Sequence, residues 1–237
     1  MKSKASPGEV LTRLLERNSH VHSVEFLVIK LPAADRHPHK NIKGSSLERE
    51  ALELRASHHI PFWMALTLTA EQRKEILPAG LIEAAGFHRS MSDAASFTVL
   101  AKDVGPSLAG IQSRVAENQM ATLSSRVQLV TGEEAHIPML DFRAPTGVTG
   151  LDAVRRVSSR LGKPGVILNS GNSYHYYGLS VCPQQDLFKF LGSALLYTPI
   201  VDHRWIGHQL VEGRCALRVS SAGASNELPF TVEYVDV

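Results

Sequence analysis

Residues 165–179 constrain the fold more than any other segment, because they have the pattern of a β-hairpin. Two apolar and aromatic runs, residues 165–168 and 174–179, flank the turn-forming sequence Asn169-Ser-Gly-Asn172. Asn and Gly favour such turns because they tolerate left-handed backbone conformations, so the flanking runs are predicted to pair as antiparallel strands. Together with helix-like segments on both sides, this hairpin predicts an α+β (mixed α/β) fold.

The first part of the chain alternates between helix-like and strand-like patterns. Ser6-Pro-Gly-Glu9 is a capping box with Pro at the first helical position, and it predicts a helix that ends near Asn18. Strands are predicted over residues 24–31, 60–69 and 96–101. Helices are predicted over residues 45–54, from Thr69 (capped with Gln72) to about residue 77, and over residues 107–126.

The second part contains the hairpin and a different mixture of elements. Its patterns predict strands over residues 135–142, 215–220 and 230–235, and helices over residues 150–161, 184–196 and 202–211. We therefore predict an N-terminal α/β unit over residues 1–130 and a second half over residues 131–237. At this length, the two are expected to form one composite globular domain.

Composition excludes several classes of protein. The 237 residues carry a formal net charge of +2, and no run approaches the roughly 20 apolar residues of a membrane-spanning helix. The N-terminus lacks the apolar core of a secretory signal, and Cys182 and Cys215 lie outside any Cys-x-x-Cys motif. We therefore expect a cytoplasmic protein without a membrane segment, a disulfide framework or a cysteine zinc site. The mild charge neither requires nor excludes a nucleic-acid partner.

Three segments of the second part carry side chains that suit a functional site. Asp141 ends an apolar strand, where it could bind a divalent cation or cap the next turn. Ser173 and His175 share one face of the second hairpin strand beside a turn whose N–H groups suit phosphate, although a structural hairpin has the same pattern. Asp202 could bind the same cation or cap the next helix. Arg204, in that helix, could face a ligand or lie on the surface.

The order of these segments resembles the archaeo-eukaryotic primase superfamily, which includes primase-polymerases and primase-like proteins of bacterial mobile and defence elements. The superfamily has a hydrophobic residue followed by Asp-x-Asp/Glu, then Ser-x-His, then a hydrophobic residue followed by an acid. The corresponding stretches here are Leu140-Asp-Phe-Arg143, Ser173-Tyr-His175 and Val201-Asp202. The resemblance covers about residues 130–237 and implies that this half is RRM-like.

This resemblance implies a primase-type nucleotidyltransferase site. Asp141 and Asp202 would bind Mg²⁺ or Mn²⁺, and His175 would join them as a catalytic residue. Ser173 and His175 would bind a nucleoside triphosphate. The chain would then be a primase-like protein of DNA replication, with single-stranded DNA or RNA as a further partner.

The first acidic motif departs from the family pattern at Arg143, which stands where the family has its second acid. Transfer through two metal ions needs carboxylates that bridge both ions, and a guanidinium would repel the second cation. Arg143, like Arg204, could instead bind phosphate directly. Nucleotidyl transfer would then be weak or lost, unless another acid such as Glu233 replaced the missing one.

Two hypotheses about function follow. In the first, the protein is a primase-type nucleotidyltransferase of weak or lost activity that binds nucleotide. In the second, it is a non-catalytic component of a bacterial defence or mobile-element system that binds nucleic acid or a partner protein. A purely structural protein, the third class, would bind no ligand at the Ser173/His175 turn.

Overall fold

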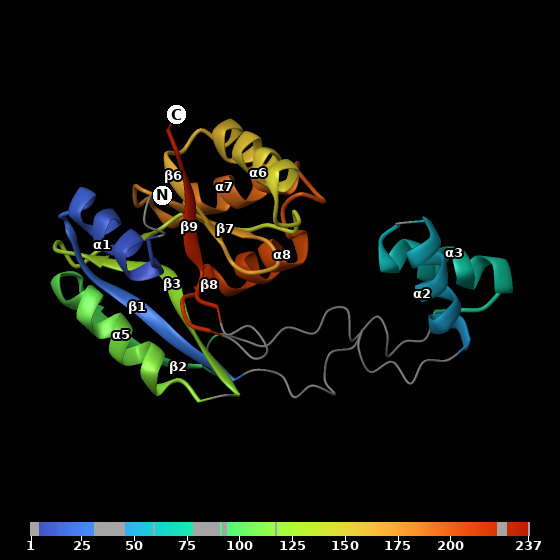
Figure 1. Cartoon of the computed structure of the whole chain (residues 1–237), viewed down its shortest axis with the longest axis horizontal. Helices are drawn as coiled ribbons and strands as arrows, with labels where there is room; N and C mark the ends of the chain where they lie inside the picture. The colour runs from blue at the N-terminus through green and yellow to red at the C-terminus, as the bar shows by residue number, and fades with distance from the viewer. Residues whose placement is uncertain are drawn as a thin grey trace. The chain divides into compact units, whose positions relative to one another are not determined.

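The computed structural model describes residues 5–30, 46–58, 60–77, 91, 94–116, 118–221 and 227–236. The chain divides into two compact units (Figure 1). Unit 1 comprises residues 1–31 and 90–237, and unit 2 comprises residues 32–89.

Unit 1 contains two antiparallel sheets, of which sheet A has the strand order β2-β1-β3-β4 with β8 as a second neighbour of β3. Its strands are β1 (Val21–Lys30), β2 (Ala95–Leu100), β3 (Gln119–Leu129), β4 (Glu134–His136) and β8 (Ala216–Arg218). Helices α1 (Pro7–Arg17) and α5 (Val104–Arg114) lie alongside this sheet, and a 3₁₀ turn, η3 (Ala101–Asp103), precedes α5 (Figure 1). Segments from both ends of the chain therefore meet in sheet A.

Sheet B has the order β5-β7-β6-β9. Its strands are β5 (Met139–Asp141), β6 (Gly165–Asn169), β7 (Tyr174–Gly178) and β9 (Phe230–Val235), and helices α6 (Val148–Arg160), α7 (Gln184–Leu195) and α8 (His203–Glu212) gather around it (Figure 1). One continuous hydrophobic core includes residues of both sheets, among them Phe26 and Tyr176. The predicted α+β fold is confirmed, and so is the hairpin, which β6 and β7 form.

The predicted N-terminal capping box of α1 is also confirmed. The Ser6 N–H donates to the Glu9 carboxylate at 2.6 Å, and the Glu9 N–H donates to the Ser6 hydroxyl oxygen at 3.3 Å. These two bonds satisfy backbone donors that a helix start otherwise leaves without partners. The helix then buries Val10, Leu11 and Leu14 in the core of unit 1.

The predicted strand over residues 60–69 is wrong, because this segment lies in a helix of unit 2, α3 (Phe62–Arg73), next to α2 (Ser46–His58). The buried side chains of α3 recur with helical spacing: Phe62, Ala65, Leu66, Thr69 and Ala70. They pack with Leu47 and Ala51 of α2 in a small separate core. Thr69 does not cap a new helix, since its hydroxyl donates to the Ala65 carbonyl one turn earlier.

The predicted helix over residues 107–126 is too long. α5 ends at Arg114, and the chain re-enters sheet A as β3. β3 has β1 on one side and both β4 and β8 on the other. Ser124 and Ser125, which weaken an apolar strand pattern, are fully buried within it. Pairing on both sides therefore overrides a weak local preference.

The predicted strand over residues 135–142 is in fact two short strands in different sheets. β4 pairs with β3 in sheet A, and β5 pairs with β7 in sheet B. Pro138 lies between them and has no N–H to donate to a ladder, which explains the break. The Pro138 carbonyl accepts a hydrogen bond from the Gly178 N–H at 2.8 Å, so the residue between the two strands is bonded to β7 of sheet B.

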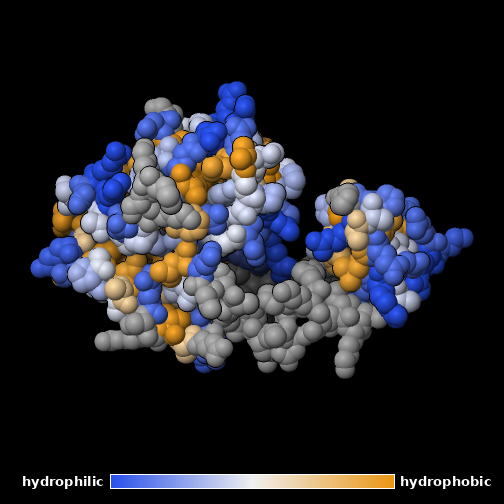
Figure 2. All heavy atoms as spheres, in the orientation of Figure 1, coloured by the Kyte–Doolittle hydropathy of each residue, from blue (hydrophilic) through white to orange (hydrophobic). Residues whose placement is uncertain are grey.

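On the face that Figure 2 shows, the described residues of each unit are largely hydrophilic, with apolar patches between the polar residues. Among the helices that the structure describes, none has the length and apolar character required to cross a bilayer.

Candidate functional site

Three of the predicted site residues meet at one end of sheet B. Asp141 of β5 lies directly opposite His175 of β7 in the antiparallel register. The Asp202 N–H donates to the Asp141 carbonyl at 2.9 Å, and the bridge between Phe142 and Val201 continues this contact. Segments 34 and 27 residues apart (175 − 141 and 202 − 175) are thus brought together by backbone pairing.

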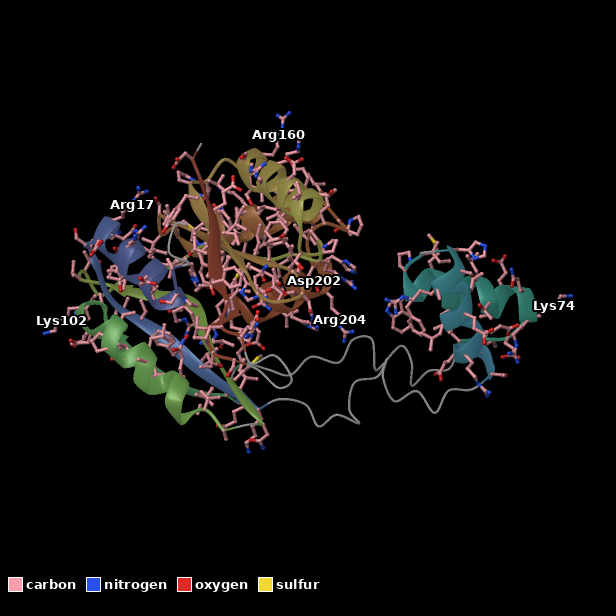
Figure 3. All side chains as sticks on the ribbon, viewed as in Figure 1. Arg17, Lys74, Lys102, Arg160, Asp202 and Arg204 are labelled. Carbon is pink, nitrogen blue, oxygen red and sulfur yellow. The ribbon has the colours of Figure 1, made fainter. Side chains whose placement is uncertain are left out.

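Asp202 begins α8 and caps it. Its side chain accepts a hydrogen bond from the Trp205 N–H at 3.0 Å, which is the capping role that the sequence offered as an alternative. This bond uses one carboxylate oxygen. The cap fixes the Asp202 side chain at the helix start beside Asp141, and Figure 3 shows Asp202 and Arg204 at the same side of unit 1.

Asp141 is in surroundings that oppose its ionisation. Burial, followed by the negative charge of Asp202, raises its pKa to about 7, against smaller opposite effects that include the charges of Arg218 and Arg143. Its side chain is nevertheless 29% exposed, so a ligand from solvent can reach it. A cation bound there would relieve the repulsion between the two carboxylates.

His175 is buried and neutral. Burial, together with the smaller effect of the neighbouring Arg218 charge, lowers its pKa to about 3. The Nε2 atom lies 3.7 Å from Asp141 Oδ1, which is too long for a hydrogen bond, and a neutral imidazole forms no ion pair there. Nδ1 is buried and has no hydrogen-bond partner within the part of the chain that the structure describes. The ring therefore retains capacity to bind a further group.

Arg218 is a member of this cluster that the sequence patterns did not single out. It lies on β8 of sheet A, yet its guanidinium donates to the Ser170 carbonyl in the hairpin turn of sheet B at 2.6 Å. It also donates to the carbonyls of Ser220 and Glu227. Its positive charge lowers the pKa of both Asp141 and His175, and burial lowers the pKa of Arg218 itself. The only sequence signal was that Arg218 falls within residues 130–237, the part of the chain that resembles the superfamily.

The hairpin turn is held by its own hydrogen bonds. The Ser170 N–H donates to the Ser173 carbonyl, and the Gly171 N–H donates to the Asn169 side chain. The Ser173 hydroxyl donates to the carbonyls of Phe142 and Ala144. Ser173 thus anchors the segment that follows β5, and two of the turn's N–H groups are already used.

Arg143 lies in that anchored segment. Its N–H donates to the Ile200 carbonyl at 2.8 Å, and its side chain is exposed. Its positive charge opposes the rise in the Asp141 pKa. Arg204 contacts His208 one turn along α8, with 3.4 Å between Nε and Nε2.

Glu233 does not supply the missing acid. It lies on β9 and pairs with Arg155 of α6, with 2.9 Å between Nη2 and Oε2. Tyr174, which precedes His175 and points to the other face of β7, also contacts the start of α6, through Gly147. Glu233 therefore faces the α6 side of sheet B, away from Asp141.

The donor set suits one divalent cation better than two. Mg²⁺ commonly takes one or two carboxylates and completes its shell with water and substrate phosphates, which Asp141 and Asp202 could provide for. Among the described residues, no cluster of three or more His, Cys, Asp or Glu side chains is arranged to hold a metal ion. Within that part of the chain, no third carboxylate joins Asp141 and Asp202 to bridge a second ion.

Comparison with models of protein families gives a match. The model of the family described as AEP-like, archaeo-eukaryotic primase 1D-like, matches residues 107–229, which is just over half of the chain. This range contains Asp141, His175, Asp202 and Arg218. No curated protein and no solved structure matches the chain.

Proposed function

Since the chain belongs to the archaeo-eukaryotic primase 1D-like family, we propose that it binds a nucleoside triphosphate at the Asp141–His175–Asp202 cluster, with nucleotidyl transfer weak or lost. The observation that carries this proposal is the convergence of these three residues from separate segments. The same cluster adjoins Arg218 and Arg143, two cations whose charges act on Asp141. Phosphate oxygens pair readily with guanidinium groups.

In this proposal His175 acts as a neutral hydrogen-bond donor to a phosphate oxygen. Nε2 is the ring atom that would donate, because it makes no hydrogen bond to Asp141, whereas Nδ1 is buried. Arg143 and Arg218 supply the positive charge, and Arg204 is a further candidate contact. Ser173 acts as a positioning residue, because it fixes the backbone that carries Arg143.

The proposed cation is a single Mg²⁺ or Mn²⁺ held by Asp141 and Asp202. When bound, it would screen phosphate charge and polarise the bond between two phosphates. Family members with a second acid at the position of Arg143 have a carboxylate for another ion. Here a fixed positive charge occupies that position, which supports nucleotide binding without efficient transfer.

The test is a calorimetric titration of the full chain with a nucleoside triphosphate in the presence of Mn²⁺. His175→Gln should weaken binding about tenfold, equivalent to ~1.4 kcal/mol, because an amide replaces the ring donor at a different position. Arg160→Gln is the matched control, since this exposed residue lies on another side of unit 1 from Asp202 (Figure 3). Equal affinity of the natural chain and a folded His175→Gln variant would contradict the assignment.

Nucleic acid is the second ligand that family membership suggests. A triphosphate and a single strand present the same phosphate chemistry, so one displacement experiment separates them. If Mn²⁺-triphosphate releases labelled single-stranded DNA, the DNA binds at the cluster. If the DNA stays bound while triphosphate saturates the protein, the DNA has a separate site.

A further inference from the structure

β2 is an open edge of sheet A. Within the described part of the chain its only strand neighbour is β1, so one row of its backbone N–H and C=O groups lacks a strand partner. Its sequence, Ala95-Ser-Phe-Thr-Val-Leu100, contains no charge and no proline. Proteins commonly place Lys or Pro on an edge strand to prevent pairing with another chain. β2 lacks both and can therefore accept a further strand.

A groove of about 640 Å³ lies between α5 and the face that β1 and β2 form. Its walls are mostly apolar, and they include Val28, Phe97 and Val99 from the strands and Pro106, Gly110 and Ile111 from α5. The volume falls within the range of about 300–1,000 Å³ that is typical of ligand sites. A strand added to β2 would have this groove beside it.

The two faces of β2 differ in polarity. Phe97 lies opposite Phe26 in the register with β1, and this face carries the groove. Thr98 lies opposite Glu25 and points to the other face, where the two residues line a polar hollow of about 300 Å³. Because side chains alternate along a strand, an added strand would place every second side chain in the groove and the others beside polar residues.

A second copy of β2 would leave the groove poorly filled. In an antiparallel pair of two copies, the groove-facing side chains would again be Phe97 and Val99. Each copy's Phe97 is already stacked on its own Phe26, with 5.7 Å between ring centroids, and forms the floor of its own groove. A segment of a different sequence, whose apolar side chains are not already packed elsewhere, would fill the space.

We propose that the β2–α5 groove binds an extended segment of a partner protein by β-strand addition. The segment carries apolar side chains at every second position and small polar side chains between them. Backbone hydrogen bonds to β2 supply affinity, and the groove selects the apolar residues. This proposal goes beyond the nucleotide-binding function, because none of the groove residues belongs to the Asp141–His175–Asp202 cluster.

The test uses a groove-filling variant, Gly110→Leu. Among the atoms that the structure describes, a Cβ added at Gly110 meets none within 4 Å, and Leu is a better helix former than Gly, so the variant should fold. Gly192→Leu in α7 is the matched control, because a Cβ there also meets no atom within 4 Å and the site lies outside the groove. Thermal melting confirms that both variants are folded.

The probe is a displayed library of random short peptides, selected on the full chain. We expect enriched peptides with alternating apolar residues, whose affinity falls at least tenfold in Gly110→Leu and stays unchanged in Gly192→Leu. Hydrogen exchange should slow at β2 amides when an enriched peptide binds. This second measurement decides the question if Gly110→Leu fails to fold.

Three results would overturn the proposal. One is a selection that enriches no peptide on the natural chain, or enriches the same peptides on a folded Gly110→Leu variant. Another is protection from exchange away from β2. The third is a dimer of the full chain, measured by light scattering, that Gly110→Leu dissociates, since this would assign the groove to a second copy.

Discussion

Asp141 occupies a position in which the folded chain favours its neutral form, and this has a consequence for stability. The folded pKa of about 7 lies above the ordinary value of 3.8, so the folded state binds more protons between these two pH values. Stability contributed by the neutral carboxyl is therefore present below the ordinary pKa and is lost as pH rises through about 7.

Asp141→Asn should raise the melting temperature at pH 8 without divalent cations and raise it less at pH 5, where only part of the stability has been lost. An amide keeps the shape and removes the ionisation that the fold disfavours. The depressed pKa of His175 makes stability rise with pH up to its ordinary value of 6.5, but this effect is common to both proteins and cancels in the comparison. Calorimetric scans at the two pH values test this, and an equal shift at both would contradict the account of Asp141.

Arg143 should contribute to phosphate binding and oppose metal binding. Arg143→Ala is expected to weaken triphosphate affinity about tenfold, as the loss of a charged hydrogen bond of ~1.5 kcal/mol would do. Arg143→Asp should lower the Mn²⁺ dissociation constant measured without nucleotide, because it exchanges a cation for a ligand. Arg160→Ala controls for the loss of an exposed charge. Unchanged Mn²⁺ affinity in a folded Arg143→Asp variant would show that this position does not face the cation.

At the scale of elements, sheet B depends on close approach at Gly165. A Cβ added there would lie 2.1 Å from the Tyr176 ring, which is held by a hydrogen bond to the Lys163 carbonyl and by stacking on Phe190. Gly165→Ala should therefore lower the free energy of unfolding by about 1–3 kcal/mol through overpacking. Gly192→Ala, where a Cβ meets nothing, should be neutral or stabilising by up to ~1 kcal/mol. Urea denaturation of both variants checks this, and equal effects would refute the packing argument.

Elements whose local pattern agreed with their tertiary surroundings were predictable. The Asn169-Ser-Gly-Asn172 turn specifies the β6–β7 hairpin, and the Ser6–Glu9 capping box specifies the start of α1. β3 was not predictable, because its strand conformation depends on partners from distant parts of the chain. α3 has a helical spacing that its apolar and β-branched residues obscured.

The candidate site was predictable in the same partial way. Motif order pointed to Asp141, His175 and Asp202, and backbone pairing explains their meeting. Arg218 could not be assigned from local pattern, since it acts across two sheets. The hydroxyl of Ser173 matched a ligand-binding pattern, but its backbone partners follow β5 some 30 residues earlier in the chain, with sequence separations of 31 and 29.

At the scale of the whole molecule, every residue of the candidate site belongs to unit 1. β1 and β2 are adjacent antiparallel strands, with Val28 opposite Ala95, so a short linker can replace residues 32–89. The shortened chain should unfold cooperatively and bind Mn²⁺-triphosphate with the affinity of the full chain. Loss of binding by a shortened chain that remains folded would show that unit 2 contributes to the site.

The most direct test of the central claim, a phosphate-binding site without two-metal transfer, is primer extension by the full chain with Mg²⁺ or Mn²⁺. The same preparation should bind triphosphate in a calorimetric titration, which shows that the site is intact. We expect binding with little or no extension, because Arg143 stands where a second ion needs a carboxylate. Robust metal-dependent extension by the natural chain, abolished by Asp141→Ala, would contradict this and establish an active polymerase.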